Sequence, residues 1–189
     1  MRIVGGKWRR RSFDAPSGRS TRPTTDRMRE SIASMVLSAT SLDLGGMAVL
    51  DAFAGSGAMG LELLSRGAAR CTFCERDRKT AAIIRANCER LGADAGTWRV
   101  VCGDVARQAG RGLWGTPFDV VFLDPPYALG ADEVSALVAS LAETGQLAPG
   151  CLVVYERSAH GERLCVPGTV ELRSRAVASS RVDLLRWEG

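Results

Sequence analysis

Between residues 47 and 155, short apolar runs alternate with longer segments whose apolar residues recur every three or four positions. Short continuous apolar runs are typical of strands buried on both faces, and the longer periodic segments are typical of amphipathic helices. Gly92, Gly130 and Gly150 separate successive units. The alternation therefore predicts a parallel sheet with helices on both faces. The predicted strands are 47–53, 70–74, 98–102, 118–123 and 151–155, and the predicted helices are 57–66, 77–91, 104–110 and 131–144.

The first 25 residues have a different pattern. Residues 1–13 predict a short β-hairpin, with strands at 2–4 and 8–13 around a Gly-Gly turn. Residues 14–25 are rich in Pro, Ser, Thr, Gly and Arg and predict a loop. The hairpin would therefore be an extension that precedes the main sheet.

A helix and two further strands complete the prediction. Thr25 or Asp26 is a suitable N-cap for a helix that runs to about Ser38. Near the end of the chain, Val170–Ala176 and Arg181–Trp187 read as a hairpin of two strands. The fold class is thus α/β, a doubly wound and mostly parallel sheet with a C-terminal antiparallel hairpin and a small N-terminal β-hairpin extension.

Charge divides the chain unevenly and supports two domains, a basic extension at 1–40 and the α/β domain at 41–189. Residues 1–29 hold nine Lys and Arg and two Asp and Glu, a net charge of +7. The remaining residues hold 16 basic and 19 acidic residues, a net charge of −3. Such a basic arm is suited to phosphates, although a solvated tail has the same composition. The candidate RNA-binding residues are Lys7, Trp8, Arg9, Arg10, Arg11 and Arg22, and Trp8 fits either base stacking or packing of the hairpin.

The six cysteines do not predict a metal site. Cys71 and Cys74 form a C-x-x-C pair, but no second pair follows and His160 is the only histidine. In a strand, a spacing of three residues points the two thiols to opposite faces. Buried reduced thiols are therefore expected, as in a cytoplasmic protein. The sequence shows neither an apolar run long enough to span a membrane nor the apolar core of a secretory signal.

A glycine-rich loop follows the first strand of the α/β domain, in the sequence D-A-F-A-G-S-G-A-M-G (51–60). Glycines allow a tight turn and close approach to a ligand, and a later acid can bind ribose hydroxyls. This pattern also fits a dinucleotide site. Asp51 favours S-adenosylmethionine, because a carboxylate there attracts a cationic amino-acid ligand and repels a pyrophosphate. The candidate cofactor-binding residues are Asp51, Phe53, Gly55, Gly57, Glu75 and Asp104, the last as an acceptor for the adenine amino group.

The strand 118–123 ends in Asp124-Pro125-Pro126-Tyr127, the candidate catalytic residues. Open α/β sheets bind ligands at this end of their strands. The exocyclic amine of a base is a poor nucleophile, and two acceptors, the Asp124 carboxylate and the Pro125 carbonyl, would aim its lone pair at a methyl donor. Tyr127 would stack on the base. A plain turn with an exposed tyrosine is the alternative.

Two sets of motifs resemble known methyltransferases. The glycine loop resembles motif I of class I methyltransferases, D-x-F-x-G-x-G, with Glu75 and Asp104 matching the later cofactor-binding acids. The opening M-R-I-V-G-G-K-W-R-R-R and the segment T-R-P-T-T-D-R-M-R-E-S (21–31) are similar to those of the bacterial RsmD family, which methylate guanine N2 in 16S ribosomal RNA. The resemblance covers essentially the whole chain. Other members carry Phe where Tyr127 stands, and the C-terminal third has no distinctive motif.

The resemblance implies a class I, Rossmann-like methyltransferase that uses S-adenosylmethionine. It implies 16S rRNA as partner, within an assembly intermediate of the small ribosomal subunit, and a cytoplasmic monomer without membrane or metal. The alternatives are a DNA adenine-N6 methyltransferase, a non-catalytic rRNA-binding protein with a relic cofactor pocket, and a dinucleotide-dependent oxidoreductase. Thermal shift with S-adenosylmethionine against NAD would separate the last from the others.

Overall fold

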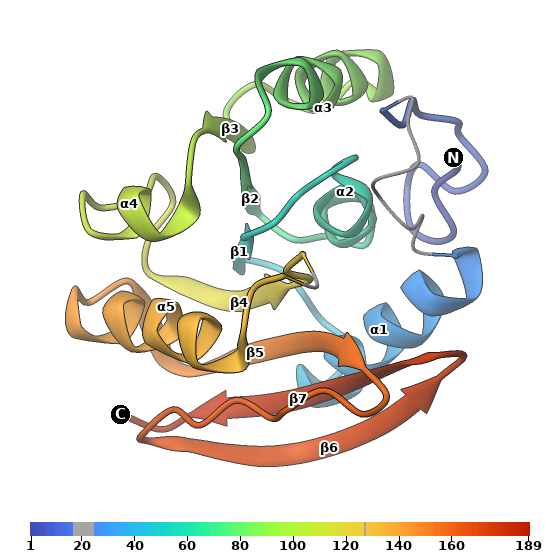
Figure 1. The fold of residues 1–189 in the computed structure, drawn as a ribbon. Helices are drawn as coiled ribbons and strands as arrows, with labels where there is room; N and C mark the ends of the chain where they lie inside the picture. Colours follow the sequence, from blue (N-terminus) through green and yellow to red (C-terminus); the bar gives the residue numbers. More distant parts are fainter. Residues whose placement is uncertain (17–24, 127) are drawn as a thin grey trace.

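A single seven-stranded sheet, in the order β3-β2-β1-β4-β5-β7-β6, organises the part of the chain that the computed structural model describes, residues 1–16, 25–126 and 128–189. β1 to β5 are parallel, and β7 runs antiparallel between β5 and β6 (Figure 1). This confirms the predicted mostly parallel sheet with an antiparallel C-terminal hairpin. The strands are β1 (Ala48–Asp51), β2 (Arg70–Glu75), β3 (Trp98–Cys102), β4 (Phe118–Leu123), β5 (Leu147–Ser158), β6 (Thr169–Val177) and β7 (Ser180–Trp187).

The sheet separates two apolar layers. α1, α2 and α3 lie on one face of the sheet and α4 and α5 on the other (Figure 1). Cys71 lies in the first layer and Cys74 in the second, so the C-x-x-C thiols point apart as predicted. The helices are α1 (Asp26–Ala39), α2 (Ala58–Ser65), α3 (Arg78–Leu91), α4 (Val105–Ala109) and α5 (Ala131–Glu143).

Local signals set the helix ends. The hydroxyl of Thr25 accepts the Met28 N–H, which confirms a cap at the start of α1. Asp77 caps α3 in the same way through the Thr80 N–H. Gly92 ends α3 in the left-handed conformation, where glycine carries no side-chain penalty. These signals explain why the predicted helices match the observed ones to within a residue or two.

The predicted N-terminal hairpin is confirmed only at its base. Residues 1–13 fold back on themselves with an antiparallel bridge between Arg2 and Ser12, flanked by hydrogen bonds from the Phe13 N–H to the Met1 carbonyl at 3.0 Å and from the Ile3 N–H to the Arg11 carbonyl at 2.9 Å, but no regular strand extends toward the turn. The N–H groups of Val4 and Gly5 instead donate to the carboxylate of Glu62 on α2, at 2.9 and 2.8 Å. A partner that lies almost sixty residues away thus binds the backbone just beyond Ile3, where the antiparallel pairing ends.

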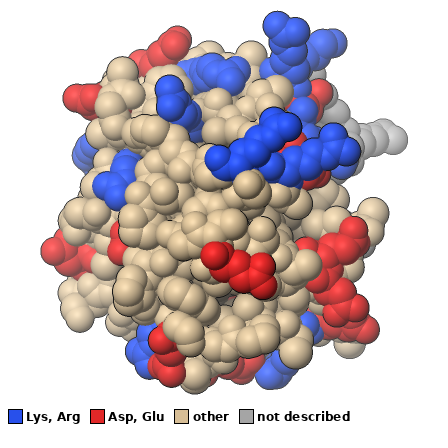
Figure 2. Space-filling model, turned by 90° about the vertical axis from the view of Figure 1, so that its left-hand side faces the viewer, with Lys and Arg blue, Asp and Glu red and all other residues tan. Residues whose placement is uncertain are grey.

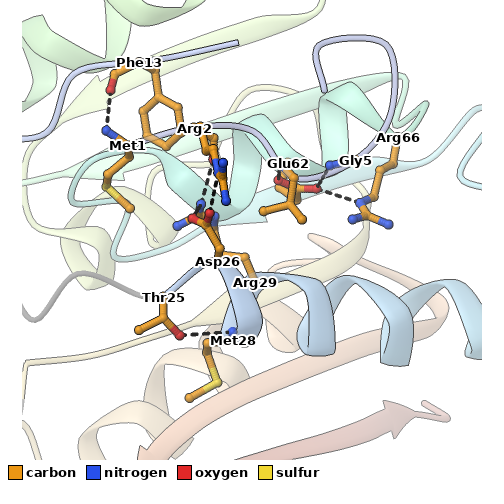
Figure 3. A network of polar contacts seen from close by, with 11 residues as sticks. Met1, Arg2, Gly5, Phe13, Thr25, Asp26, Met28, Arg29, Glu62 and Arg66 are labelled. Carbon is orange, nitrogen blue, oxygen red and sulfur yellow. Dashed lines mark hydrogen bonds and ion pairs between the residues drawn. The ribbon is translucent and has the colours of Figure 1, made fainter. Parts of the chain in front are cut away.

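Glu62 is the centre of this attachment, which Figure 3 shows in detail. Its side chain is fully buried and also accepts from Arg66 Nε at 2.8 Å. One turn further on, Ser65 Oγ donates to the Gly5 carbonyl and accepts the Trp8 N–H. The N-terminal segment therefore packs against α2 and shares the first apolar layer, while the proposed boundary at residue 40 remains a prediction.

No helix within the described ranges is both long enough and apolar enough to cross a membrane.

Candidate active site at the carboxyl edge of the sheet

Three carboxylates meet where β1, β4 and β5 end. Asp51 is the last residue of β1, and it pairs with Phe122 of β4, which pairs in turn with Val154 of β5. Asp124 and Glu156 each lie two residues further along those strands. Since side chains alternate along a strand, all three carboxylates continue the face that carries the first apolar layer. Sequence reasoning found Asp51 and Asp124 but missed Glu156.

Burial and the charges of neighbouring carboxylates raise the pKa of two of these residues, Asp51 and Asp124. Asp51 is buried, and burial raises its pKa to about 7 although its carboxylate accepts the Gly60 N–H at 3.0 Å. Burial, then the negative charges of Glu156 and Asp51, raise the pKa of Asp124 to about 8. A cationic ligand beside them would favour the ionised forms, so the site has the charge expected for a sulfonium compound.

The three loop glycines serve two different purposes. Gly55 has a φ of +51°, and a Cβ there would meet only the Phe53 carbonyl, at 4.0 Å, so the space beyond it is open to a ligand. At Gly57, with φ +74°, a Cβ would come within 3.1 Å of Ile84 in the core. At Gly60, a Cβ would lie 2.3 Å from the Phe73 ring. Of the three, only Gly55 thus faces open space, while Gly57 and Gly60 allow the start of α2 to pack closely against α3 and β2.

The other predicted cofactor residues also lie at this edge. Glu75 ends β2 and accepts the N–H groups of Gly55 and Asp77 at 2.9 and 2.8 Å, which leaves carboxylate lone pairs for ribose hydroxyls. Asp104 follows β3 and caps α4 through the Arg107 N–H at 3.0 Å. Phe53 is half-buried against the second apolar layer. The structure therefore brings the predicted cofactor residues together around the ends of three neighbouring strands.

A pocket of about 210 Å³ opens beside the tetrapeptide. Asp124, Pro125 and Pro126 line one side, and the end of β5 with the loop after it lines the other. Arg157 stabilises that loop, because its Nε binds buried Asp183 at 2.5 Å and its guanidinium donates to the Gly161 carbonyl at 2.6 Å. The predicted stacking residue Tyr127 lies outside the described residues.

The predicted RNA-binding residues of the N-terminal segment, residues 7–11, are not at this edge. Trp8 is only 5% exposed and belongs to the core, so of its two interpretations the structure supports packing, and stacking on a base is excluded in this conformation. Arg11 donates to the carbonyls of Leu91 and Arg90 at the end of α3. The ends of α2 and α3 lie opposite the carboxyl edge, because each helix runs antiparallel to its strands.

Arg9 and Arg10 are exposed, as is Lys7, whose ammonium lies 4.7 Å from the centre of the Trp8 ring. Their role in RNA binding stays a prediction, as does that of Arg22, which lies outside the described residues.

Sequence reasoning overlooked a second group of basic residues. Exposed Arg76, Arg78 and Lys79 follow β2, and exposed Arg107 follows β3, so all four lie near the carboxyl edge. Figure 2 shows Lys and Arg gathered on the upper part of its face, toward the end of the sheet that carries α3 and β3. The net charge of −3 after residue 29 concealed this local excess. The signal that could have revealed these basic residues is their position directly after a predicted strand.

The thiols of the C-x-x-C pair are unreactive. Burial raises the pKa of Cys71 well above its usual range and that of Cys74 to about 12, so both stay protonated at neutral pH. Within residues 1–16, 25–126 and 128–189, no group of three or more His, Cys, Asp or Glu is arranged to hold a metal ion.

The strand order, the glycine loop and the acids at the ends of β1 to β3 define a class I methyltransferase fold. A magnesium protoporphyrin IX methyltransferase from Synechocystis, solved with bound S-adenosylmethionine, shares this fold with a TM-score of 0.62 at 17% identity, over 89% of this chain and 86% of that one. The solved Escherichia coli protein yhhF is more similar, with a TM-score of 0.83 at 32% identity over 100% of this chain and 98% of its own.

The family follows from sequence comparison. The family model described as "Conserved hypothetical protein 95" matches residues 1–185. The chain is 37% identical to ribosomal RNA small subunit methyltransferase D of Escherichia coli over 94% of this chain and 85% of the relative. The Haemophilus influenzae protein of the same name is 32% identical over 82% and 78%. The chain belongs to the RsmD family of methyltransferases, and family and fold together make S-adenosylmethionine its cofactor.

Proposed function

We propose that this chain transfers a methyl group from S-adenosylmethionine to the exocyclic N2 of a guanine in 16S rRNA. The observation that carries the proposal is the position of Asp124, beside a pocket at the carboxyl end of β4 and close to the cofactor residues. The relatives named as small-subunit rRNA methyltransferases support RNA as the substrate. A partly assembled small subunit as substrate, a monomeric enzyme and a cytoplasmic location belong to the same proposal.

Different residues of the chain would bind the cofactor and act on the guanine amine. Glu75 and Asp104 would hold the ribose and the adenine of the cofactor, and the loop at Gly55 would admit its amino-acid part near Asp51. When bound, S-adenosylmethionine supplies an electrophilic methyl group on a positively charged sulfur. The chain's own residues then have to orient the guanine amine and remove its proton.

Asp124 is suited to both of these tasks. Its carboxylate accepts one N–H of the amine and the Pro125 carbonyl accepts the other, which directs the nitrogen lone pair toward the methyl group. The methylated amine then loses a proton, and Asp124, which already accepts a hydrogen bond from it, is the candidate acceptor. A pKa of about 8 in the free protein makes its carboxylate a stronger base than an ordinary aspartate.

The test is the set of modified nucleosides in 16S rRNA from cells that lack the gene, compared with cells that carry the wild type or Asp124→Ala. We expect N2-methylguanine to be lost without the gene, restored by the wild type and not restored by Asp124→Ala. The same purified proteins should show this difference on small-subunit particles. Methylation of adenine N6 in DNA, with no change in rRNA, would instead support the alternative of a DNA methyltransferase.

A further inference from the structure

The pocket beside Asp124 contains a second carboxylate whose position relative to the first is fixed by the sheet. Leu123 of β4 pairs with Tyr155 of β5 in parallel register. The next residues on the two strands are Asp124 and Glu156, which therefore lie side by side. Both line the pocket.

The electrostatics agree with this proximity. After burial, the negative charge of Glu156 is the largest influence that raises the pKa of Asp124. Each carboxylate is only partly exposed, so water screens their repulsion incompletely. A ligand that offers two hydrogen-bond donors side by side would relieve this repulsion.

Among the bases with a methylatable exocyclic amine, guanine alone meets that requirement. Its N2 amine stands beside N1–H, so two neighbouring positions are donors. In adenine the N6 amine stands beside an unprotonated N1, and in cytosine the N4 amine stands beside an unprotonated N3, so the second position is an acceptor. A carboxylate opposite an acceptor is repelled and left without a hydrogen bond, which is costly in a partly buried site.

We infer that Glu156 is the residue that selects guanine, by accepting the N1–H while Asp124 and the Pro125 carbonyl hold the N2 amine. This inference rests on the proposed function and extends it from the reaction to the choice of base. It gives a physical reason why a tetrapeptide able to grip any exocyclic amine would act on guanine in this chain.

Single-turnover methyl transfer to two RNAs tests the inference. One RNA carries the guanine that the wild type methylates, as mapped by mass spectrometry, and the other carries 2-aminopurine at that position. 2-Aminopurine keeps the amine but lacks N1–H. We expect the wild type to prefer guanine by on the order of 100-fold or more, since a site built for a donor rejects an analogue that lacks it.

Glu156→Gln should reduce that preference to within about tenfold, because its amide can donate to the unprotonated N1 of 2-aminopurine. Glu156→Asp, which keeps the carboxylate, should retain most of the preference. Glu162→Gln is the matched control, since Glu162 lines the same pocket from the exposed loop after β5 and should leave the preference unchanged. Cofactor affinity and thermal unfolding establish that each variant is folded.

An unchanged preference for guanine in folded Glu156→Gln would overturn the inference while leaving the proposed function intact. A wild type that forms N6-methyladenine instead of N2-methylguanine would overturn both. If Glu156→Gln fails to fold, Glu156→Asn decides the question, because it also replaces the carboxylate by an amide and should lower the guanine to 2-aminopurine ratio, whereas a purely structural Glu156 predicts an unchanged ratio.

Discussion

Asp124 couples the pH dependence of stability to the active site. Its folded pKa of about 8, and that of Asp51 of about 7, lie above the ordinary value of about 4 for aspartate. The folded protein therefore binds more protons than the unfolded chain between these values, so the free energy of unfolding falls as pH rises from about 4 to about 8.

We predict that the melting temperature of the cofactor-free protein decreases from pH 5.5 to pH 8.5, and that Asp124→Asn reduces this decrease. Each kcal/mol of stability corresponds to roughly 2–4 °C in a chain of this size. The same substitution should lower turnover on the order of a hundredfold or more, because a catalytic acceptor is removed. Differential scanning calorimetry of both proteins across this range checks the first part, and parallel curves would show that Asp124 ionises normally.

The loop glycines provide a second test at the scale of single residues. Gly55→Ala places a methyl group in the open space of the loop and should weaken S-adenosylmethionine binding by about tenfold or more, at a conformational cost of about 1–2 kcal/mol. Gly60→Ala should instead destabilise the fold by about 1–3 kcal/mol through overlap with Phe73. Titration calorimetry and urea unfolding separate the two effects. Unchanged affinity in Gly55→Ala would remove this loop from the cofactor site.

At the scale of elements, the attachment of the N-terminal segment to α2 depends on Glu62. Glu62→Ala would leave Arg66 and two backbone N–H groups without their acceptor, and we predict a loss of about 3–5 kcal/mol in the free energy of unfolding. Glu171 is the control, because its ion pair with Arg163 has the same length of 2.8 Å but is exposed. Glu171→Ala should cost at most about 1 kcal/mol in urea unfolding. Equal losses of unfolding free energy in the two variants would mean that the buried contacts of Glu62 stabilise the protein no more than an exposed ion pair does.

The contrast between strands and N-terminal segment shows what a local pattern can predict. β3 and β4 were predicted to the residue, since short apolar runs between helical segments carry a strong signal, although only β4 is buried on both faces and β3 is a partly exposed edge strand. The N-terminal hairpin forms only at its base, because Val4 and Gly5 beyond it donate to Glu62, a contact that no pattern within residues 1–13 contains. Asp124 was found because its motif is contiguous. Glu156 was missed because only the register of β4 against β5 places it beside Asp124.

At the scale of the whole molecule, two groups of basic residues among those that the structure describes lie on separate surfaces. Arg78 and Arg107 lie near the carboxyl edge, whereas Arg9 and Arg10 lie near the ends of α2 and α3. α2 alone spans about 12 Å between these two ends. An RNA that places a base in the pocket would therefore reach the first surface with its flanking nucleotides and the second only with more distant ones.

We predict that Arg78→Ala with Arg107→Ala weakens binding of an RNA of about ten nucleotides and reduces its salt slope by about 0.7 for each phosphate that is no longer neutralised. Arg9→Ala with Arg10→Ala should change binding of intact 16S rRNA but not of the short RNA. Arg175→Ala, on the exposed edge strand β6, is the control. Titrations over a range of salt concentrations measure the slopes. If the short RNA responds to Arg9 and Arg10 instead, the arm lies over the pocket.

The place of β7 between β5 and β6 constrains the order in which the chain can fold. β6 is synthesised before β7. In the sheet that the structure describes, however, β7 is the only strand with which β6 pairs. Until residues 180–187 are available, β6 has no strand to join, and the growing edge of the sheet stops at β5. Addition of the β6–β7 hairpin to β5 is thus a late event during synthesis, although the pairings themselves are local, since β7 follows β6 across a tight turn and Ser180 of β7 pairs with Ser158 of β5. During synthesis, β5 would present an open edge able to pair with other chains, and β7 is the element that ends that exposure.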